Sequence, residues 1–394
     1  MSKAAKDISL SIPYLNGNEW KYVRECLDTG WVSSVGKFVD KFEQAVGAYT
    51  GAKNAIACVN GTSGLQVALR LCGVGPGDEV IVPTLTFIAP VNAVRYLYAD
   101  PVFMDCDDYM NLDAVKLREF CGRECVMTRS GLKNKKSGKI IKAVVPVHIF
   151  GNPCDMALIM AIAKKYRLKV VEDATESLGS YFLHGRYRKR HTGTIGDFGV
   201  YSFNGNKIIT TGGGGMIVTS SAKLAAKAKY LTTQAKDDGV RYVHNEIGYN
   251  FRLTNLQAAL GLAQLEQLPG FIKTKKDNYK LYKELLAEVS GVEILGVPVG
   301  TIPNYWFYSL RVDKRVFGMD KDVLMERLRA KGIQTRPIWQ LNHRQRPYSR
   351  NQSYIIENAP RYWQQVLNLP CSTNLKAAQV EYIASVIKNL GGKN

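Results

Sequence analysis

The chain has 394 residues, of which 46% are hydrophobic and 22% charged, as in an ordinary globular protein. This composition excludes a disordered, collagen-like or coiled-coil protein, and no apolar run approaches the ~20 residues of a membrane-spanning helix. Lys and Arg total 53 against 34 Asp and Glu, giving a net charge of +19 that favours anionic ligands. Nucleic acid, an anionic membrane surface and phosphorylated small molecules are therefore all candidate partners.

The eight cysteines include no Cys-x2-Cys pair, so no metal site is predicted. Cys58 and Cys106 lie in apolar, strand-like runs and are expected to be small buried side chains. No apolar stretch follows Met1–Asp7, so no secretory signal is expected. We therefore expect reduced thiols and a cytoplasmic location.

Apolar runs and helical periodicity alternate along the first half of the chain. Helices are predicted at 18–28 and 38–49, and from residue 55 short strands and helices follow one another. The predicted strands are 55–59, 79–82, 101–104, 142–147 and 168–172, and the intervening helices are 62–71, 87–96, 113–120 and 156–166. This alternation predicts an α/β fold with a large, mostly parallel sheet covered by helices. The basic cluster 133–142 is expected to form a hairpin or loop.

After residue 173 the pattern changes to short strands joined by glycine-rich turns. Strands are predicted at 199–203, 207–209 and 216–219, and helices at 222–234 and 254–268. Pro269 and Gly270 are expected to end the last helix. The remainder, with a strand at 306–312 and helices at 273–289, 321–331 and 377–390, suggests a smaller α+β domain. We therefore expect an N-terminal arm and helix at 1–30, a large domain at 31–268 and a small C-terminal domain at 269–394.

The glycine clusters do not match nucleotide-binding motifs. The segment beginning at Gly73 precedes a strand rather than a helix, so it fails as a dinucleotide fingerprint. Gly212–Gly215 likewise precedes a predicted strand. These glycines are expected to adopt positive φ or to allow a close backbone approach.

Three other features carry more chemical information. Asn60-Gly-Thr-Ser places Thr62 and Ser63 at a helix N-terminus, which is either a simple cap or an anion site. Asp173 ends an apolar strand, where a carboxylate could bind a metal, a ribose or a cationic ring nitrogen. Lys207 lies between a polar turn and an apolar pair, so it is either a surface lysine or an amine nucleophile with a lowered pKa.

Together these features match the needs of pyridoxal phosphate (PLP). The helix N-terminus would bind the phosphate, and Asp173 would keep the pyridine nitrogen protonated. Lys207 would bind the aldehyde covalently. The combination is far more specific than any one of the three features.

Several motifs then resemble one family, the DegT/DnrJ/StrS sugar-nucleotide aminotransferases, which are fold-type I PLP enzymes that act as dimers. The resemblance runs from about residue 8 to residue 390. It implies a large sheet of about seven strands plus a small C-terminal α+β domain. The motifs are Trp31-Val-Ser-Ser-Val-Gly, Asn60-Gly-Thr-Ser, Gly77-Asp-Glu-Val-Ile-Val-Pro, Pro146-Val-His-Ile-Phe-Gly, Glu172-Asp-Ala-Thr-Glu-Ser, Ser202-Phe-Asn-Gly-Asn-Lys, Gly248-Tyr-Asn-Phe-Arg-Leu-Thr and Thr335-Arg-Pro-Ile-Trp.

The resemblance implies a role for each matching residue. Lys207 and Asp173 would be catalytic, and Phe87 would stack on the cofactor ring. Glu176 stands near the ring hydroxyl, where many relatives have Gln or His. The remaining implied contacts are Thr62, Ser63 and Ser202 to the phosphate, Asn250 to the phosphate from the partner subunit, and Arg336, His343 and Trp31 to the sugar nucleotide. The implied protein is a homodimer with shared active sites.

Two substrates fit this resemblance. The insertion at 121–142 and the segment beginning at Thr232 resemble the branch that transfers the amino group of L-glutamate to C4 of a UDP-linked 4-keto-6-deoxy-N-acetylhexosamine, in pathways to bacillosamine and legionaminic acid. Glu43 and the run from Ile208 to Gly212 resemble the GDP-perosamine synthases, which are the alternative. A lysine at 207 favours transamination over sugar dehydration, because the dehydrating branch has histidine there.

A basic nucleic-acid-binding protein is the remaining alternative. No helix-turn-helix, RNA-recognition or zinc-finger pattern supports it. No segment combines an apolar face with a lysine-rich face well enough to suggest membrane binding. The sequence therefore predicts an enzyme that binds neither nucleic acid nor membrane.

Overall fold

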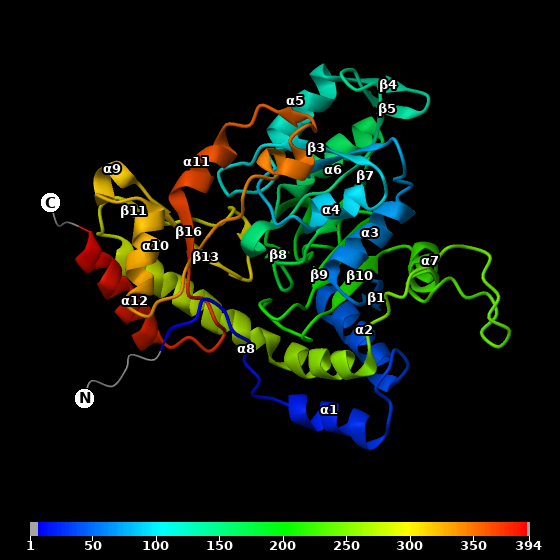
Figure 1. Cartoon of the computed structure of the whole chain (residues 1–394), viewed down its shortest axis with the longest axis horizontal. Coiled ribbons are helices and arrows are strands. Elements are labelled where there is room, and N and C mark those ends of the chain that lie inside the picture. Colours follow the sequence, from blue (N-terminus) through cyan, green and yellow to red (C-terminus); the bar gives the residue numbers. More distant parts are fainter. Residues whose placement is uncertain (1–6, 392–394) are drawn as a thin grey trace.

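The computed structural model of the chain describes residues 7–391 (Figure 1). Residues 1–6 of the predicted N-terminal arm lie outside the described residues. The arm then passes into α1 (Glu19–Asp28).

A ten-stranded sheet forms the centre of the larger part of the molecule. Its order is β1-β10-β9-β7-β6-β2-β3-β15, and the hairpin β4–β5 extends from β6. Along this path only β10 runs antiparallel to its neighbours, because every pair from β9 to β15 is parallel. In the hairpin, β5 runs antiparallel to both β4 and β6. The strands are β1 Asn54–Cys58, β2 Glu79–Pro83, β3 Asp100–Met104, β4 Cys125–Thr128, β5 Gly131–Asn134, β6 Ile140–Val144, β7 Lys169–Asp173, β9 Phe198–Ser202, β10 Gly215–Thr219 and β15 Ser353–Tyr354. The predicted α/β fold is confirmed. The basic cluster 133–142 forms the turn between the antiparallel strands β5 and β6 together with the adjoining strand ends, so the predicted hairpin is confirmed.

Helices cover both faces of this sheet, as parallel strands require. In β2 every residue is buried, because Val80 and Val82 join one apolar cluster and Ile81 joins the opposite one. The first cluster includes α3, α4 and α7, and the second includes α5 and α6. The bounds are α2 Lys37–Thr50, α3 Gly61–Leu71, α4 Ala89–Arg95, α5 Ala114–Arg123, α6 Met156–Tyr166 and α7 Ala222–Thr232. Cys58 and Cys106 are buried, as predicted.

The C-terminal part forms a second, four-stranded antiparallel sheet with the order β11-β13-β16-β14. The C-terminal part also contributes a strand to the large sheet, since β15 pairs with β3. This strand extends the sheet beyond the seven strands expected. The elements are β11 Val292–Ile294, β13 Tyr308–Val312, β14 Arg336–Pro337, β16 Val366–Leu369, α9 Lys314–Phe317, α10 Lys321–Arg329, α11 Asn358–Gln365 and α12 Ala377–Leu390, while β12 Thr301–Ile302 pairs with β8 Tyr181–Phe182.

Helix α8 runs without interruption from Asn255 to Leu286 and lies beneath both parts of the molecule (Figure 1). The prediction that Pro269 ends a helix is therefore wrong. A proline inside a helix costs about 3 kcal/mol. Here Leu265 and Leu268 pack into one core while Tyr282 and Leu286 pack into another, and burial on both sides of the proline offsets that cost. The proposed domain boundary at 268 falls inside this helix.

Candidate active site

A cavity of about 470 Å³ opens where the large sheet meets the C-terminal part. The start of α3, the end of β9, the loop after it and the segment 334–339 supply its walls. Leu10 and Ser11 of the N-terminal segment also line it. Of the residues predicted for the site, the cavity is lined by Thr62, Phe87, Glu176, Ser202, Lys207 and Arg336.

The N-terminus of α3 forms one wall of this cavity. The side chain of Asn60 caps the helix by accepting a hydrogen bond from the Ser63 N–H at 2.8 Å. A Cβ atom on Gly61 would lie 3.0 Å from Cβ of Ser202, so glycine allows the helix to approach β9 closely. Thr62 faces the cavity, whereas Ser63 is buried and does not line it. The helix dipole is thus directed at an open polar space, which suits an anion.

Asp173 ends β7 and is buried; it does not line the cavity, but it lies near enough to Lys207 for the two charges to interact. Burial raises the pKa of this carboxyl above its usual value, although a hydrogen bond from Thr175 and the charge of Lys207 act in the opposite direction. Within residues 7–391, Thr175 is the only donor to this carboxylate, through its N–H at 3.1 Å. Asp173 therefore retains acceptor capacity for a further cationic donor.

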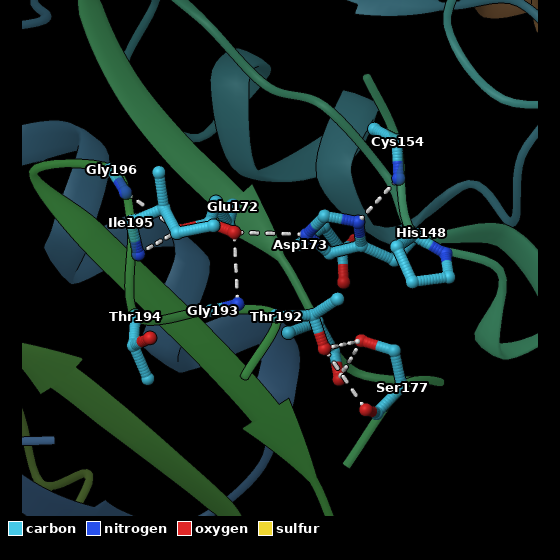
Figure 2. A network of polar contacts seen from close by, with 12 residues as sticks. His148, Cys154, Glu172, Asp173, Ser177, Thr192, Gly193, Thr194, Ile195 and Gly196 are labelled. Atoms are coloured by element: carbon cyan, nitrogen blue, oxygen red, sulfur yellow. Dashed lines mark hydrogen bonds and ion pairs between the residues drawn. The ribbon is translucent and has the colours of Figure 1, made fainter. Parts of the chain in front are cut away.

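The preceding residue, Glu172, fixes the backbone around Asp173 (Figure 2). Its buried carboxylate accepts hydrogen bonds from the N–H groups of Gly193, Ile195 and Gly196 at 2.8, 2.6 and 2.6 Å. It also lies 3.0 Å from Nε2 of His148. The Cys154 N–H donates to Nδ1 of His148, so the imidazole must carry its proton on Nε2 and donate it to Glu172.

Lys207 projects from the loop between β9 and β10. The predicted strand at 207–209 is wrong, because the Lys207 N–H closes a turn by bonding to the Asn204 carbonyl at 3.0 Å. The glycines that follow behave as predicted: Gly212 has φ +78°, and a Cβ on Gly215 would lie 2.6 Å from the Asn60 carbonyl carbon. This loop brings the amine into the cavity beside the start of α3.

The Lys207 amine and the Glu176 carboxylate form a buried pair, with Nζ and Oε1 4.0 Å apart. Burial lowers the pKa of Lys207, and the two neighbouring carboxylates act against this. Burial also raises the pKa of Glu176 to about 7, although the Lys207 charge and the Phe150 N–H favour its ionised form. Burial therefore brings the pKa values of the two groups closer together, which favours proton exchange between them.

Five of the predicted residues do not line this cavity: Asp173 and Ser63, described above, and Trp31, Asn250 and His343. Trp31 is 57% exposed and Asn250 is also exposed, so neither lines the cavity of its own chain. His343 lies against Thr84, with Nδ1 2.5 Å from the hydroxyl oxygen, and burial lowers the pKa of its ring. The contact of His343 with the sugar nucleotide therefore stays a prediction, since His343 does not line the cavity of its own chain.

Residues distant in sequence complete the cavity, and the motifs did not indicate them. The sequence predicted only a strand at Trp306, and it indicated no functional residue in the N-terminal segment. Such residues are found only when the tertiary structure brings them together. They include Leu10, Ser11, Trp306, Phe307, Gln334 and Asn368.

Comparison with known proteins identifies the family. The model of the DegT/DnrJ/EryC1/StrS aminotransferase family matches residues 13–388. The chain belongs to this family. It is a pyridoxal-phosphate-dependent sugar aminotransferase.

Two curated relatives match almost the whole chain. A GDP-perosamine synthase of Caulobacter vibrioides is 39% identical over 387 residues, covering 96% of this chain and 97% of the relative. A GDP-perosamine synthase of Escherichia coli O157:H7 is 36% identical over 382 residues, covering 97% and 98%.

Solved structures share the fold. A DegT DnrJ EryC1 StrS aminotransferase from Brucella abortus has a TM-score of 0.85 at 28% identity, covering 95% of this chain and 96% of its own. DesI, solved in the presence of its TDP-sugar product, has a TM-score of 0.86 at 27% identity, covering 98% and 93%.

The cavity fits the cofactor in two respects: Asp173 has acceptor capacity for a ring nitrogen, and the start of α3 is open to a phosphate. Among residues 7–391 no helix is long and apolar enough to cross a membrane. The same residues include no group of three or more His, Cys, Asp or Glu side chains arranged for a metal ion.

Proposed function

We propose that the protein transfers the amino group of L-glutamate to C4 of GDP-4-keto-6-deoxymannose and thus makes a GDP-linked 4-amino sugar. The observation that carries amino transfer is the cavity that brings Lys207 and the α3 N-terminus together, with the buried carboxylate of Asp173 close to Lys207. The nucleotide is supported by the names of the relatives from Caulobacter vibrioides and Escherichia coli O157:H7. These relatives correct the preference for a UDP-linked substrate that the insertion at 121–142 suggested.

In this proposal each residue of the cavity has a distinct task. The α3 N-terminus with Thr62 and Ser202 would bind the cofactor phosphate through N–H and hydroxyl donors. Asp173 would accept a hydrogen bond from the protonated ring nitrogen. When bound, PLP supplies an electron sink that stabilises negative charge at the substrate carbon.

Lys207 would bind the cofactor covalently at rest and carry a proton to C4 of the sugar during turnover. Glu176 would hold that proton between steps, because burial raises its pKa to about 7 and lowers the pKa of Lys207, which brings the two values closer together. Its other oxygen is occupied by the Phe150 N–H at 2.7 Å, which keeps Oε1 directed at Lys207. Phe87, at the cavity mouth, would cover the ring face.

The nucleotide diphosphate would need cationic donors. Arg336 lines the cavity from β14 and is the candidate. Part of the +19 net charge of the chain would then attract an anionic substrate.

The active unit would be a homodimer with shared sites. Asn250 and Trp31 are exposed and stand outside the cavity of their own chain, which is consistent with their serving a partner subunit. Mixing Lys207→Ala and Asn250→Ala chains should restore one intact site per heterodimer. Heterodimers that form but remain inactive would contradict shared sites.

A substrate panel tests the proposal directly. The protein would be incubated with PLP, L-glutamate and either GDP-4-keto-6-deoxymannose or UDP-2-acetamido-4-keto-2,6-dideoxyhexose, and the products analysed by mass spectrometry. We expect an amino product from the GDP-linked sugar. A product from the UDP-linked sugar alone would replace the proposed nucleotide, whereas no product from any 4-keto nucleotide sugar would refute the proposal.

A further inference from the structure

The indole of Trp306 lies directly against the amine of Lys207. The Nζ atom stands 4.1 Å from the ring centroid, about as close as it stands to Glu176. An ammonium group over an indole face is attracted by the ring electrons, most strongly when both are removed from water. Trp306 is 2% exposed, so this contact is shielded.

Trp306 is fixed at three points of its structure. Its indole Nε1–H donates to the carbonyl of Asn206 at 2.8 Å, which ties the ring to the residue next to Lys207. Its backbone N–H donates to the side chain of Asn304 at 3.0 Å. Asn304 in turn donates to the carbonyls of Glu176 and Leu178 at 2.9 and 3.0 Å. These hydrogen bonds fix the position of the indole ring relative to both the Lys207 amine and the segment that contains Glu176.

The third point is the Trp306 carbonyl, which accepts a hydrogen bond from Lys275 at 3.1 Å. Lys275 projects from α8, is 1% exposed and also donates to the Cys371 carbonyl. In the described part of the chain no ion pair joins Lys275 to a carboxylate. Burying an amine without a counter-ion is costly, so its hydrogen bonds to two carbonyls are what compensate it. One of these two hydrogen bonds, to the Trp306 carbonyl, holds the tryptophan that contacts Lys207.

We propose that Trp306 is a positioning residue for Lys207: its indole face holds the amino group as an ammonium ion whenever the lysine is not bonded to the cofactor. Two kinds of group then act on this amine, the carboxylates of Glu176 and Asp173 and the neutral face of Trp306. The carboxylates can take a proton from the amine, whereas the indole cannot. Trp306 therefore stabilises the charged lysine without competing for its proton. The inference rests on the proposed role of Lys207 in proton transfer.

The test measures the pKa of the Lys207 amine in the full-length protein after removal of PLP. The protein would be labelled with trace acetic anhydride between pH 6 and 11, and acetylation of the peptide that contains Lys207 would be quantified by mass spectrometry. We expect Trp306→Leu to lower this pKa by ~0.5 to 1 unit, about a 3- to 10-fold shift in the protonation equilibrium, because the ring no longer favours the charged form. Trp306→Phe, which keeps a weaker ring face, should lower it by less.

Phe307→Leu is the matched control. Phe307 lines the same cavity and packs against Trp306 at a centroid distance of 4.2 Å, but no contact joins its ring to the amine among the described residues. An unchanged pKa in both Trp306 variants, or an equal decrease in Phe307→Leu, would overturn the proposal. If Trp306→Leu does not fold, the decrease in Trp306→Phe relative to Phe307→Leu decides the question.

This measurement requires no sugar substrate. A wrong nucleotide assignment would appear in the substrate panel and leave the labelling result unchanged. A failed Trp306 inference would appear only in the labelling experiment.

Discussion

Replacing Glu172 by glutamine tests how the carboxylate beside Asp173 stabilises the site. The substitution changes one oxygen to an amide nitrogen and removes the charge. In the native protein one oxygen accepts from the N–H groups of Ile195 and Gly196, and the other accepts from Gly193 and lies against His148. An amide has only one acceptor oxygen, so whichever way it is oriented its nitrogen must face two donors.

The expected loss of stability follows from those contacts. His148 cannot relieve the conflict by moving its proton, because Nδ1 already accepts from Cys154. Two buried donors are therefore left without acceptors, at about 1–3 kcal/mol each. We expect Glu172→Gln to lower the free energy of unfolding by about 2–6 kcal/mol.

Urea denaturation at neutral pH, followed by circular dichroism, would measure this difference. Asp155→Asn is the matched control, because Asp155 caps α6 through the Leu158 N–H alone and asparagine caps a helix equally well. We expect almost no change in the control. A loss below about 1 kcal/mol in Glu172→Gln would show that the four contacts do not act as argued.

Three further outcomes are expected. Asp173→Asn should leave the fold intact but reduce kcat by several orders of magnitude, because an amide cannot keep the ring nitrogen protonated; a loss below about tenfold, or 1.4 kcal/mol, in steady-state kinetics would contradict this. Arg336→Ala should raise KM for the nucleotide sugar about tenfold or more and affect the glutamate half-reaction less. Stopped-flow kinetics would measure each half-reaction separately, and an equal loss in both would show that Arg336 does not contact the diphosphate. Burial lowers the pKa of Lys275, so the unfolded chain binds more protons than the folded one between that lowered pKa and about 10.4. Stability should therefore rise with pH across this range, and Lys275→Met should remove that part of the rise in urea denaturation at pH 7.5 and 9.5.

The sequence alone was enough to predict the structural features that a local pattern of residues determines. Short apolar runs such as 80–82 became strands buried on both faces. Asn60 capped a helix, and Gly215 stood where only glycine fits. These features depend on neighbouring residues and on the period of the hydrophobic pattern, so they could be predicted without a partner segment.

Tertiary structure decided the features that depend on distant contacts. Pro269 would end an isolated helix, but cores on both sides of it hold α8 continuous. Lys207 lies in a turn rather than in a strand, because its loop closes through Asn204. Trp306 and Lys275 are 99 and 68 positions from Lys207 along the chain. No local pattern assigns a tryptophan to a distant amine, since such a contact exists only after two sheets and α8 have packed together.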